Sequence, residues 1–173
     1  ICGACMMYHT EYADNGMQKM SALPVRQGNL FFGKFVIAAL VLSAMVVLET
    51  AVLAGCAEYW FPGYAFDRAE AVKTAGFQIA VTLPTVMLML VIASACRNMW
   101  ISLGIGVILV FTLSVFPQDN EVLSLFPFAS PYQTFAAAAE NGRALLFVAA
   151  CGIETVLFGI AEVIYLKVRR WSA

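Results

Sequence analysis

The amino-acid sequence predicts an all-α protein, a polytopic bundle of transmembrane helices. Of its 173 residues, 62% are hydrophobic and only 12% are charged, and the mean hydropathy is +0.83. A soluble domain has about 25% charged residues, because most of its surface faces water. The composition therefore excludes a soluble enzyme with one buried core and also a disordered chain. The net charge of −1 leaves no basic field for nucleic acid.

Four apolar stretches account for this composition. A helix that crosses about 30 Å of hydrocarbon needs about 20 apolar residues. The stretches that reach this length are Phe35–Cys56, Phe77–Cys96, Met99–Pro117 and Ala144–Leu166. A fifth, Ile1–Tyr8, is only a stub, which we interpret as the end of an earlier span. We therefore expect a single transmembrane domain over residues 1–173, in a fragment that has lost sequence on its N-terminal side.

Acidic residues interrupt two of these spans. One acidic residue at a helix centre costs about 2.5–3.5 kcal/mol for insertion, and each Leu, Ile, Phe or Val returns about 0.3–0.6 kcal/mol. Phe35–Cys56 contains eleven such residues and Ala144–Leu166 contains twelve, so both spans still insert. Glu162 is expected near the headgroups. Glu49 and Glu154 lie deep, and each is either a functional intramembrane carboxylate or a neutral group bonded to a neighbouring helix.

The distribution of Lys and Arg predicts which side is cytoplasmic. One set of alternating loops carries seven of these cations and the other set carries three. Because cytoplasmic loops are enriched in Lys and Arg, the first set is expected inside. The seven are Lys19, Arg26, Lys34, Arg97, Lys167, Arg169 and Arg170. Aromatic residues near the span ends fit an interfacial belt, namely Tyr59, Trp60 and Phe61 outside and Trp100 and Trp171 inside.

The most informative polar stretch is His9–Lys34, on the predicted inner side. A short helix is expected to begin at Thr10 or at Asn15. It must end by Pro24, because the residue before a proline disfavours helix. The alternative is an ordinary loop whose cations reach the headgroups.

The order of residues in this stretch resembles the permeases of ABC-2-type ATP-binding-cassette transporters. Glu11, Gly16, Leu23-Pro24-Val25-Arg26 and Gly33-Lys34 precede a long apolar run, as in the six-helix permeases of the lantibiotic-immunity and peptide-export group. The resemblance implies that the Glu-to-Gly segment is a coupling helix that docks on the ATPase subunit. Many relatives have Thr after the Gly, where this chain has Met17.

We expect an ATPase-coupling interface at seven residues, Glu11, Asp14, Gly16, Leu23, Pro24, Val25 and Arg26. The resemblance assigns six of them, and Asp14 is added because its charge, like that of Glu11, could pair with a basic groove on the partner. The resemblance implies a cytoplasmic ABC ATPase as partner, with ATP and Mg²⁺ bound there and no cofactor in this chain. It also implies a second permease copy or paralogue, surrounding membrane lipid and location in a bacterial cell membrane. The transported substrate would be a lantibiotic or another amphipathic peptide. The chain itself is then a transport subunit and not an enzyme.

The outer segment between the third and fourth spans contains a predicted short helix, Pro131–Glu140. Ser130 is a suitable N-cap, with Gln133 at capping-box spacing, and Asn141-Gly142 marks the end. A short outer helix before the last span is a further resemblance to this permease family, in which such helices help to close the outer side. Gly152 and Gly159, seven residues apart, are expected to allow close helix packing.

The sequence contains two other motifs that are typical of known functional sites. Gly28–Lys34 fits GxxxxGK, but Phe35 replaces the required Ser or Thr, so the sequence predicts no phosphate loop. Cys2 and Cys5, with His9, make an incomplete metal site. They leave a membrane thiol oxidoreductase as one alternative, and a non-catalytic membrane scaffold subunit is another.

Overall fold

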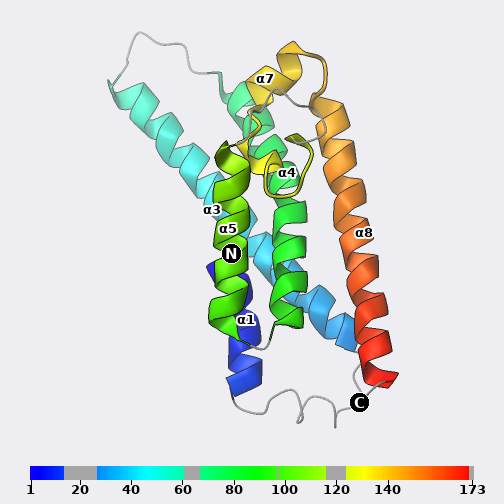
Figure 1. Cartoon of the computed structure of the whole chain (residues 1–173). Coiled ribbons are helices and arrows are strands. Elements are labelled where there is room, and N and C mark those ends of the chain that lie inside the picture. Colours follow the sequence, from blue (N-terminus) through cyan, green and yellow to red (C-terminus); the bar gives the residue numbers. More distant parts are fainter. Residues whose placement is uncertain (14–26, 61–66, 97, 116–123, 172–173) are drawn as a thin grey trace.

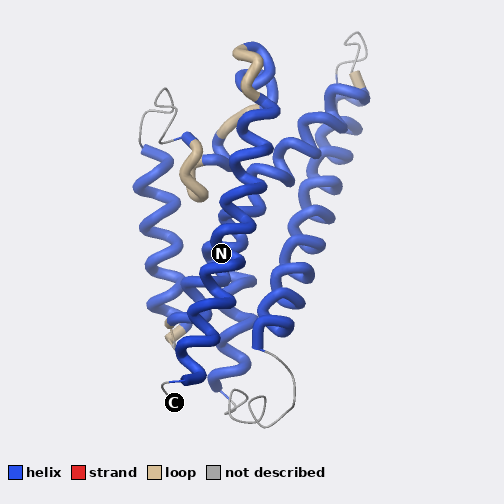
Figure 2. Tube along the Cα trace, turned by 90° about the vertical axis from the view of Figure 1, so that its right-hand side faces the viewer, coloured by secondary structure: helices blue, strands red, loops and turns tan. Residues whose placement is uncertain are grey.

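A computed structural model describes residues 1–13, 27–60, 67–96, 98–115 and 124–171. These residues are helical almost throughout and contain no strand, which confirms the all-α prediction. The elements are α1 (Cys2–Ala13), α3 (Gln27–Trp60), α4 (Arg68–Ala95), α5 (Met99–Val115), the 3₁₀ turn η1 (Ser130–Tyr132), α7 (Phe135–Glu140) and α8 (Ala144–Trp171). In Figure 2 the loops gather toward the two ends of the bundle.

Three of the four predicted spans, α3, α4 and α8, have the length and apolar composition to cross a membrane. The fourth, α5, is apolar but has 17 residues. All three long helices extend beyond the apolar stretches that predicted them. Hydropathy ends at the first charged residues, whereas the helical backbone continues through them.

The polar start of α4 shows why the predicted boundaries were too short. Asp67 caps this helix, because its carboxylate accepts a hydrogen bond from the Ala69 N–H at 2.9 Å. Glu70 lies in the first turn, where a negative charge is favourable. Two further turns, outside the predicted span, are thereby helical.

Successive long helices run in alternating directions through the bundle, as the predicted alternation of inner and outer loops requires. Figure 1 places the end of α1, the start of α3, the end of α4, the start of α5 and the end of α8 at one end of the bundle. We call this end the base; the sequence predicts that it faces the cytoplasm. The opposite, outer end carries α7. Tyr59 and Trp60 at the outer end of α3 and Trp100 at the base are exposed, as the predicted aromatic belt requires.

Helix α3 departs most from a compact bundle. Its 34 residues span about 51 Å, so the helix must tilt or project beyond a 30 Å core. Figure 1 shows it running obliquely, with its outer end apart from α4 and α8. No residue from 36 to 60 is fully buried. α3 therefore joins the bundle mainly through its basal part.

Helix α4 is central. It packs against α1, α3, α5, α7 and α8. Its buried residues contribute to two apolar clusters, one toward the base around Met89, Leu90 and Ala93 and one toward the outer end around Phe77 and Val81. A helix in contact on so many sides can carry a displacement from one end of the bundle to the other.

Candidate coupling site at the base of the bundle

The candidate site begins with the last turns of α1. The buried side of this helix carries Ala4, Cys5 and Tyr8, and Tyr12 follows Tyr8 by one turn, half-buried. The rings of Tyr8 and Tyr12 stack with centroids 6.4 Å apart. This spacing brings two aromatic side chains and Glu11 to the base.

An ion pair joins α1 to α3. The Lys34 Nζ lies 2.5 Å from Glu11 Oε2, and the two side chains are 14% and 15% exposed. The same Nζ lies 3.5 Å from the centroid of the Tyr8 ring, a cation–π contact. Partial burial reduces solvent screening of the pair. In contrast, the Arg68–Glu58 pair at the outer end is widely exposed and contributes little.

A hydrogen bond joins α1 to α4. The Tyr12 hydroxyl donates to the Ser94 main-chain oxygen at 2.7 Å, across 82 residues of sequence. Ser94 lies in the last turn of α4, where main-chain carbonyls have no partner within their own helix. Tyr12 therefore satisfies an acceptor that the end of α4 would otherwise leave unpaired.

A second contact of Ser94 extends the connection to α8. Its hydroxyl donates to Glu162, and both residues are 1% exposed. Glu162 was expected near the headgroups. The structure places it close to the base but buried, where a hydrogen bond offsets part of the cost of removing it from water.

We call these six residues the basal cluster: Tyr8, Glu11, Tyr12, Lys34, Ser94 and Glu162. They come from α1, α3, α4 and α8, and they lie toward the base, the end of the bundle at which α1 ends and α3 begins. Apolar packing supports the cluster, since Phe31 and Leu166 are buried in the same apolar cluster as Tyr8. The basal cluster thus connects four helices at the base of the bundle.

The outer end carries a second organised region, the outer segment, residues 124–134. Phe128, Ala129 and Ser130 in it are almost completely buried. Thr85, 17 residues from the start of α4 and so about 26 Å along its axis, donates a hydrogen bond to the Pro127 carbonyl. The outer segment therefore enters the bundle deeply and returns to the outer end through α7.

This arrangement corrects the predicted helix Pro131–Glu140. The structure has two elements, the 3₁₀ turn η1 and the helix α7. Ser130 is not an N-cap, because its hydroxyl donates to the Val81 main-chain oxygen. Thr134 caps α7, accepting from the Ala137 N–H at 3.4 Å. Gly142, with φ of 66°, confirms the predicted helix end.

A comparison with known protein families identifies the family to which this chain belongs. A family model described as ABC-2 family transporter protein matches residues 1–113, which include α1, α3, α4 and most of α5. This chain belongs to the ABC-2 transporter family. No curated protein and no solved structure matches significantly. The chain is thus a membrane permease subunit of an ABC transporter, and its partner is an ABC ATPase.

Only part of the predicted coupling interface of this permease falls in the described residues. Glu11 lies in α1, two residues before its end, and pairs with Lys34. The other six lie outside the described residues: Asp14, Gly16, Leu23, Pro24, Val25 and Arg26. The helix start predicted at Thr10 is wrong, because α1 continues through this residue and the Thr10 hydroxyl bonds to the carbonyls of Met6 and Met7. The Asn15 start falls outside the described residues.

The sequence interpretation missed most of the basal cluster. It assigned no partner within the bundle to Lys34 or to Tyr12. In the permease both side chains bond within the bundle. A signal was present in the sequence Tyr8–Tyr12 at the end of an apolar stretch, because a buried tyrosine hydroxyl needs a hydrogen-bond partner.

The two deep carboxylates differ in their surroundings. Glu49 is exposed on α3, and no hydrogen bond to it occurs among the described residues. Glu154 is half-buried on α8, and its Oε2 is buried with no hydrogen-bond partner in the described part of the chain. Neither carboxylate belongs to the basal cluster.

The two remaining motifs lie in helices. Gly28–Lys34, which resembled a phosphate loop, is helical and part of α3. Cys2 is exposed and Cys5 is buried on α1, and neither forms a disulfide with a described residue. Family membership assigns the chain to transport.

Proposed function

We propose that this permease exports, or extracts from the membrane, a lantibiotic or another amphipathic peptide, using ATP and Mg²⁺ bound by a separate ATPase subunit. Two copies of the permease, or one copy and a paralogue, would form the transport path in a bacterial cell membrane. The observation that supports this proposal is the basal cluster, which joins four helices at the end of the bundle where α1 ends and α3 begins.

The first step of the proposed coupling is at the ends of α1 and α3. The ATPase would contact residues 14–26 together with Glu11, as the family resemblance implies. A displacement of that segment acts on Ala13 and Gln27, its two helical neighbours. Because the Glu11–Lys34 pair connects α1 to α3, the two helices would move together.

The second step carries the displacement into the bundle. The Tyr12 hydroxyl holds the end of α4, and Ser94 bonds to Glu162 of α8. Helix α4 also holds the outer segment through Gln78, Val81 and Thr85. A movement of α4 at the base would therefore shift the outer segment at the opposite end, and the path for the substrate would open or close there.

A charge-exchange experiment tests the coupling. The permease and its ATPase are reconstituted together, and substrate-stimulated ATP hydrolysis is measured. Glu11→Lys is expected to leave membrane insertion intact and to abolish stimulation, since it places two cations at the Lys34 site. The double variant Glu11→Lys, Lys34→Glu restores an opposite-charge pair and is expected to recover part of the stimulation. Full stimulation in Glu11→Lys would reject the proposed coupling role.

The exposed pair at the outer end provides a matched control. Glu58→Lys disrupts the Arg68–Glu58 pair, which is far more exposed than the Glu11–Lys34 pair. We expect it to leave stimulation unchanged. The substrate is tested separately, by measuring whether cells that produce the permease and its ATPase tolerate more lantibiotic. Unchanged tolerance with intact ATPase coupling would reject the lantibiotic and retain the coupling site.

A further inference from the structure

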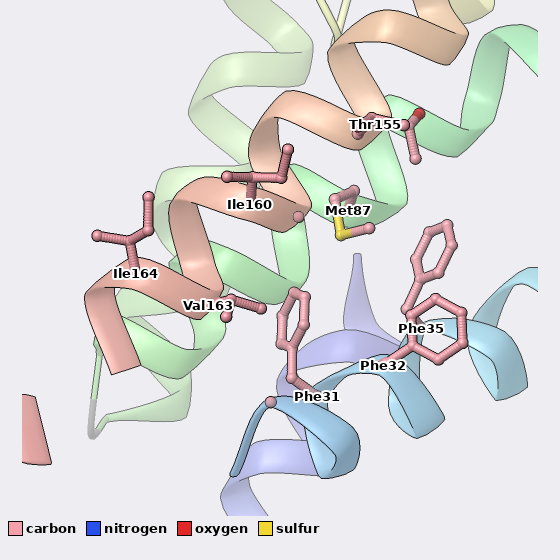
Figure 3. A pocket seen from close by; sticks show the side chains of 11 residues that line it. Phe31, Phe32, Phe35, Met87, Thr155, Ile160, Val163 and Ile164 are labelled. Carbon is pink, nitrogen blue, oxygen red and sulfur yellow. The ribbon is translucent and has the colours of Figure 1, made fainter. Parts of the chain in front are cut away.

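An apolar groove opens between α3 and α8 near the base, with a volume of about 420 Å³. Figure 3 shows three phenylalanines of α3 facing a row of aliphatic side chains on α8, with Met87 of α4 between them. We call it the basal groove, and its principal lining residues are Phe31, Phe32, Phe35, Met87, Val163 and Ile164. Its volume is in the range of small-molecule sites, about 300–1,000 Å³.

Two glycines bring the walls of the basal groove together. A Cβ at Gly28 would lie 3.6 Å from Val163, where α3 meets α8. A Cβ at Gly159 would lie 3.3 Å from the terminal methyl of Met87, so the bare glycine leaves room for the floor of the groove. On the open side Phe32 and Ile164 are 61% and 56% exposed. The close contacts at the two glycines thus bound the groove on its inner side, and its other side is open toward the surrounding membrane.

The lining offers only hydrocarbon to a ligand. Its one polar side chain, Thr155, donates its hydroxyl to the Cys151 carbonyl at 2.7 Å. The aromatic and aliphatic walls therefore fit an alkyl chain and provide no free donor for a sugar or a peptide bond. A peptide strand would leave its main-chain groups unpaired here, at a cost of several kcal/mol for each group in an apolar medium.

A cation lies at the basal end of this groove. Lys167 follows Val163 by four residues and Ile164 by three, so it lies on the same face of α8. It is exposed and forms no ion pair with any residue that the structure describes. Since Lys167 lies close to the end of α8, its ammonium can reach the headgroup layer while its stem lies along apolar surface.

We propose that the basal groove binds an anionic phospholipid, with one acyl chain between α3 and α8 and the phosphate on Lys167. Charge complementarity selects this occupant: the groove accepts hydrocarbon, and Lys167, which pairs with no residue in the described part of the chain, accepts an anion at the depth of a headgroup. A bound chain would fill the space between the first turns of α3 and the last turns of α8. The lipid would thereby hold together two helices that contribute to the basal cluster.

Native mass spectrometry of the purified full chain in detergent tests this proposal. The protein is incubated with equal amounts of phosphatidylglycerol and phosphatidylcholine, and retained lipid is counted. We expect one retained phosphatidylglycerol in preference to phosphatidylcholine. Lys167→Gln should reduce this preference by roughly fivefold and retain both lipids about equally. Ile160→Trp, which places an indole in the groove, should reduce retention of both lipids.

Matched variants separate the groove from general effects of charge and bulk. Lys73→Gln removes an exposed lysine at the outer end of the bundle, and Leu157→Trp adds an indole on an exposed part of α8 outside the groove. Both should retain phosphatidylglycerol like the unmodified chain. The proposal is wrong if Lys167→Gln keeps the full preference, if Ile160→Trp keeps both lipids, or if the unmodified chain shows no preference. None of these results depends on ATP hydrolysis, so they are independent of the coupling function.

Discussion

The Ser130 hydroxyl donates a hydrogen bond to the Val81 main-chain oxygen at 2.8 Å and so anchors the outer segment to the middle of α4. Ser130 and Val81 are both completely buried. The contact lies next to Pro84, which lacks an N–H and weakens the helix at this point. Side-chain hydrogen bonds from the adjoining segment are one way in which such a site in a transmembrane helix is stabilised.

Ser130→Ala is expected to lower the stability of the permease by about 0.5–1.5 kcal/mol, the net contribution of one hydrogen bond. The measurement is thermal unfolding in detergent, followed by circular dichroism. Ser114→Ala is the control, because the Ser114 hydroxyl is exposed and bonds to the Phe111 carbonyl in its own helix. Equal effects of the two variants would contradict the anchoring role of Ser130.

Two glycines of α5 should respond differently to the same substitution. A Cβ at Gly106 would lie 2.7 Å from the Met89 sulfur, and Met89 is 1% exposed, so its side chain has little room to move. A Cβ at Gly104 meets nothing within 4 Å. Gly106→Ala should therefore be less stable than Gly104→Ala by about 1–3 kcal/mol.

The comparison of these two variants removes the helix-propensity effect, which both substitutions share. Chemical or thermal unfolding in the same detergent gives the difference directly. A Gly106→Ala protein as stable as Gly104→Ala would mean that α4 and α5 do not approach each other as closely as the structure shows.

The buried carboxylates of α8 should also differ. Glu162 bonds to Ser94, so Glu162→Met is expected to destabilise the bundle and lower its unfolding temperature. Glu154 buries Oε2 without a hydrogen-bond partner among the described residues. Because such an atom costs about 1–3 kcal/mol, Glu154→Met should leave the unfolding temperature unchanged or raise it. A lower unfolding temperature for Glu154→Met would show that this carboxylate stabilises the fold.

Hydropathy predicted the transmembrane segments because it distinguishes segments that face lipid from segments that face water. Phe77–Cys96 and Ala144–Leu166 lie inside α4 and α8 almost as predicted. The expected packing face of α8 was only half right. Gly159 is close to Met87, but a Cβ at Gly152 would meet nothing within 4 Å. A seven-residue spacing places both glycines on one face, yet the path of α4 decides which of them is at a contact.

The contacts of the basal cluster were less predictable, because they join residues that are far apart in the sequence. The family resemblance placed Glu11 at the base, but its partner Lys34 follows 23 residues later, and the Tyr12–Ser94 contact spans 82 residues. Such pairs depend on how α1 packs against α3 and α4, which no local pattern encodes. The predicted helix Pro131–Glu140 was wrong for a different reason. Ser130 has the sequence pattern of an N-cap, but its hydroxyl forms a tertiary hydrogen bond to α4 instead.

The last prediction concerns the two tyrosines of α1, whose hydroxyl groups differ in their hydrogen bonds. Tyr12→Phe keeps the ring that stacks on Tyr8 and removes only the hydrogen bond to Ser94. Tyr8→Phe keeps the ring below the Lys34 ammonium, and no hydrogen bond from its hydroxyl occurs among the described residues. If the link from α1 to α4 carries the coupling, Tyr12→Phe should reduce substrate-stimulated ATP hydrolysis by roughly fivefold, the factor that corresponds to one hydrogen bond. Tyr8→Phe should retain it. Equal stimulation in both variants, with both proteins inserted and bound to the ATPase, would show that displacement reaches α4 by another route.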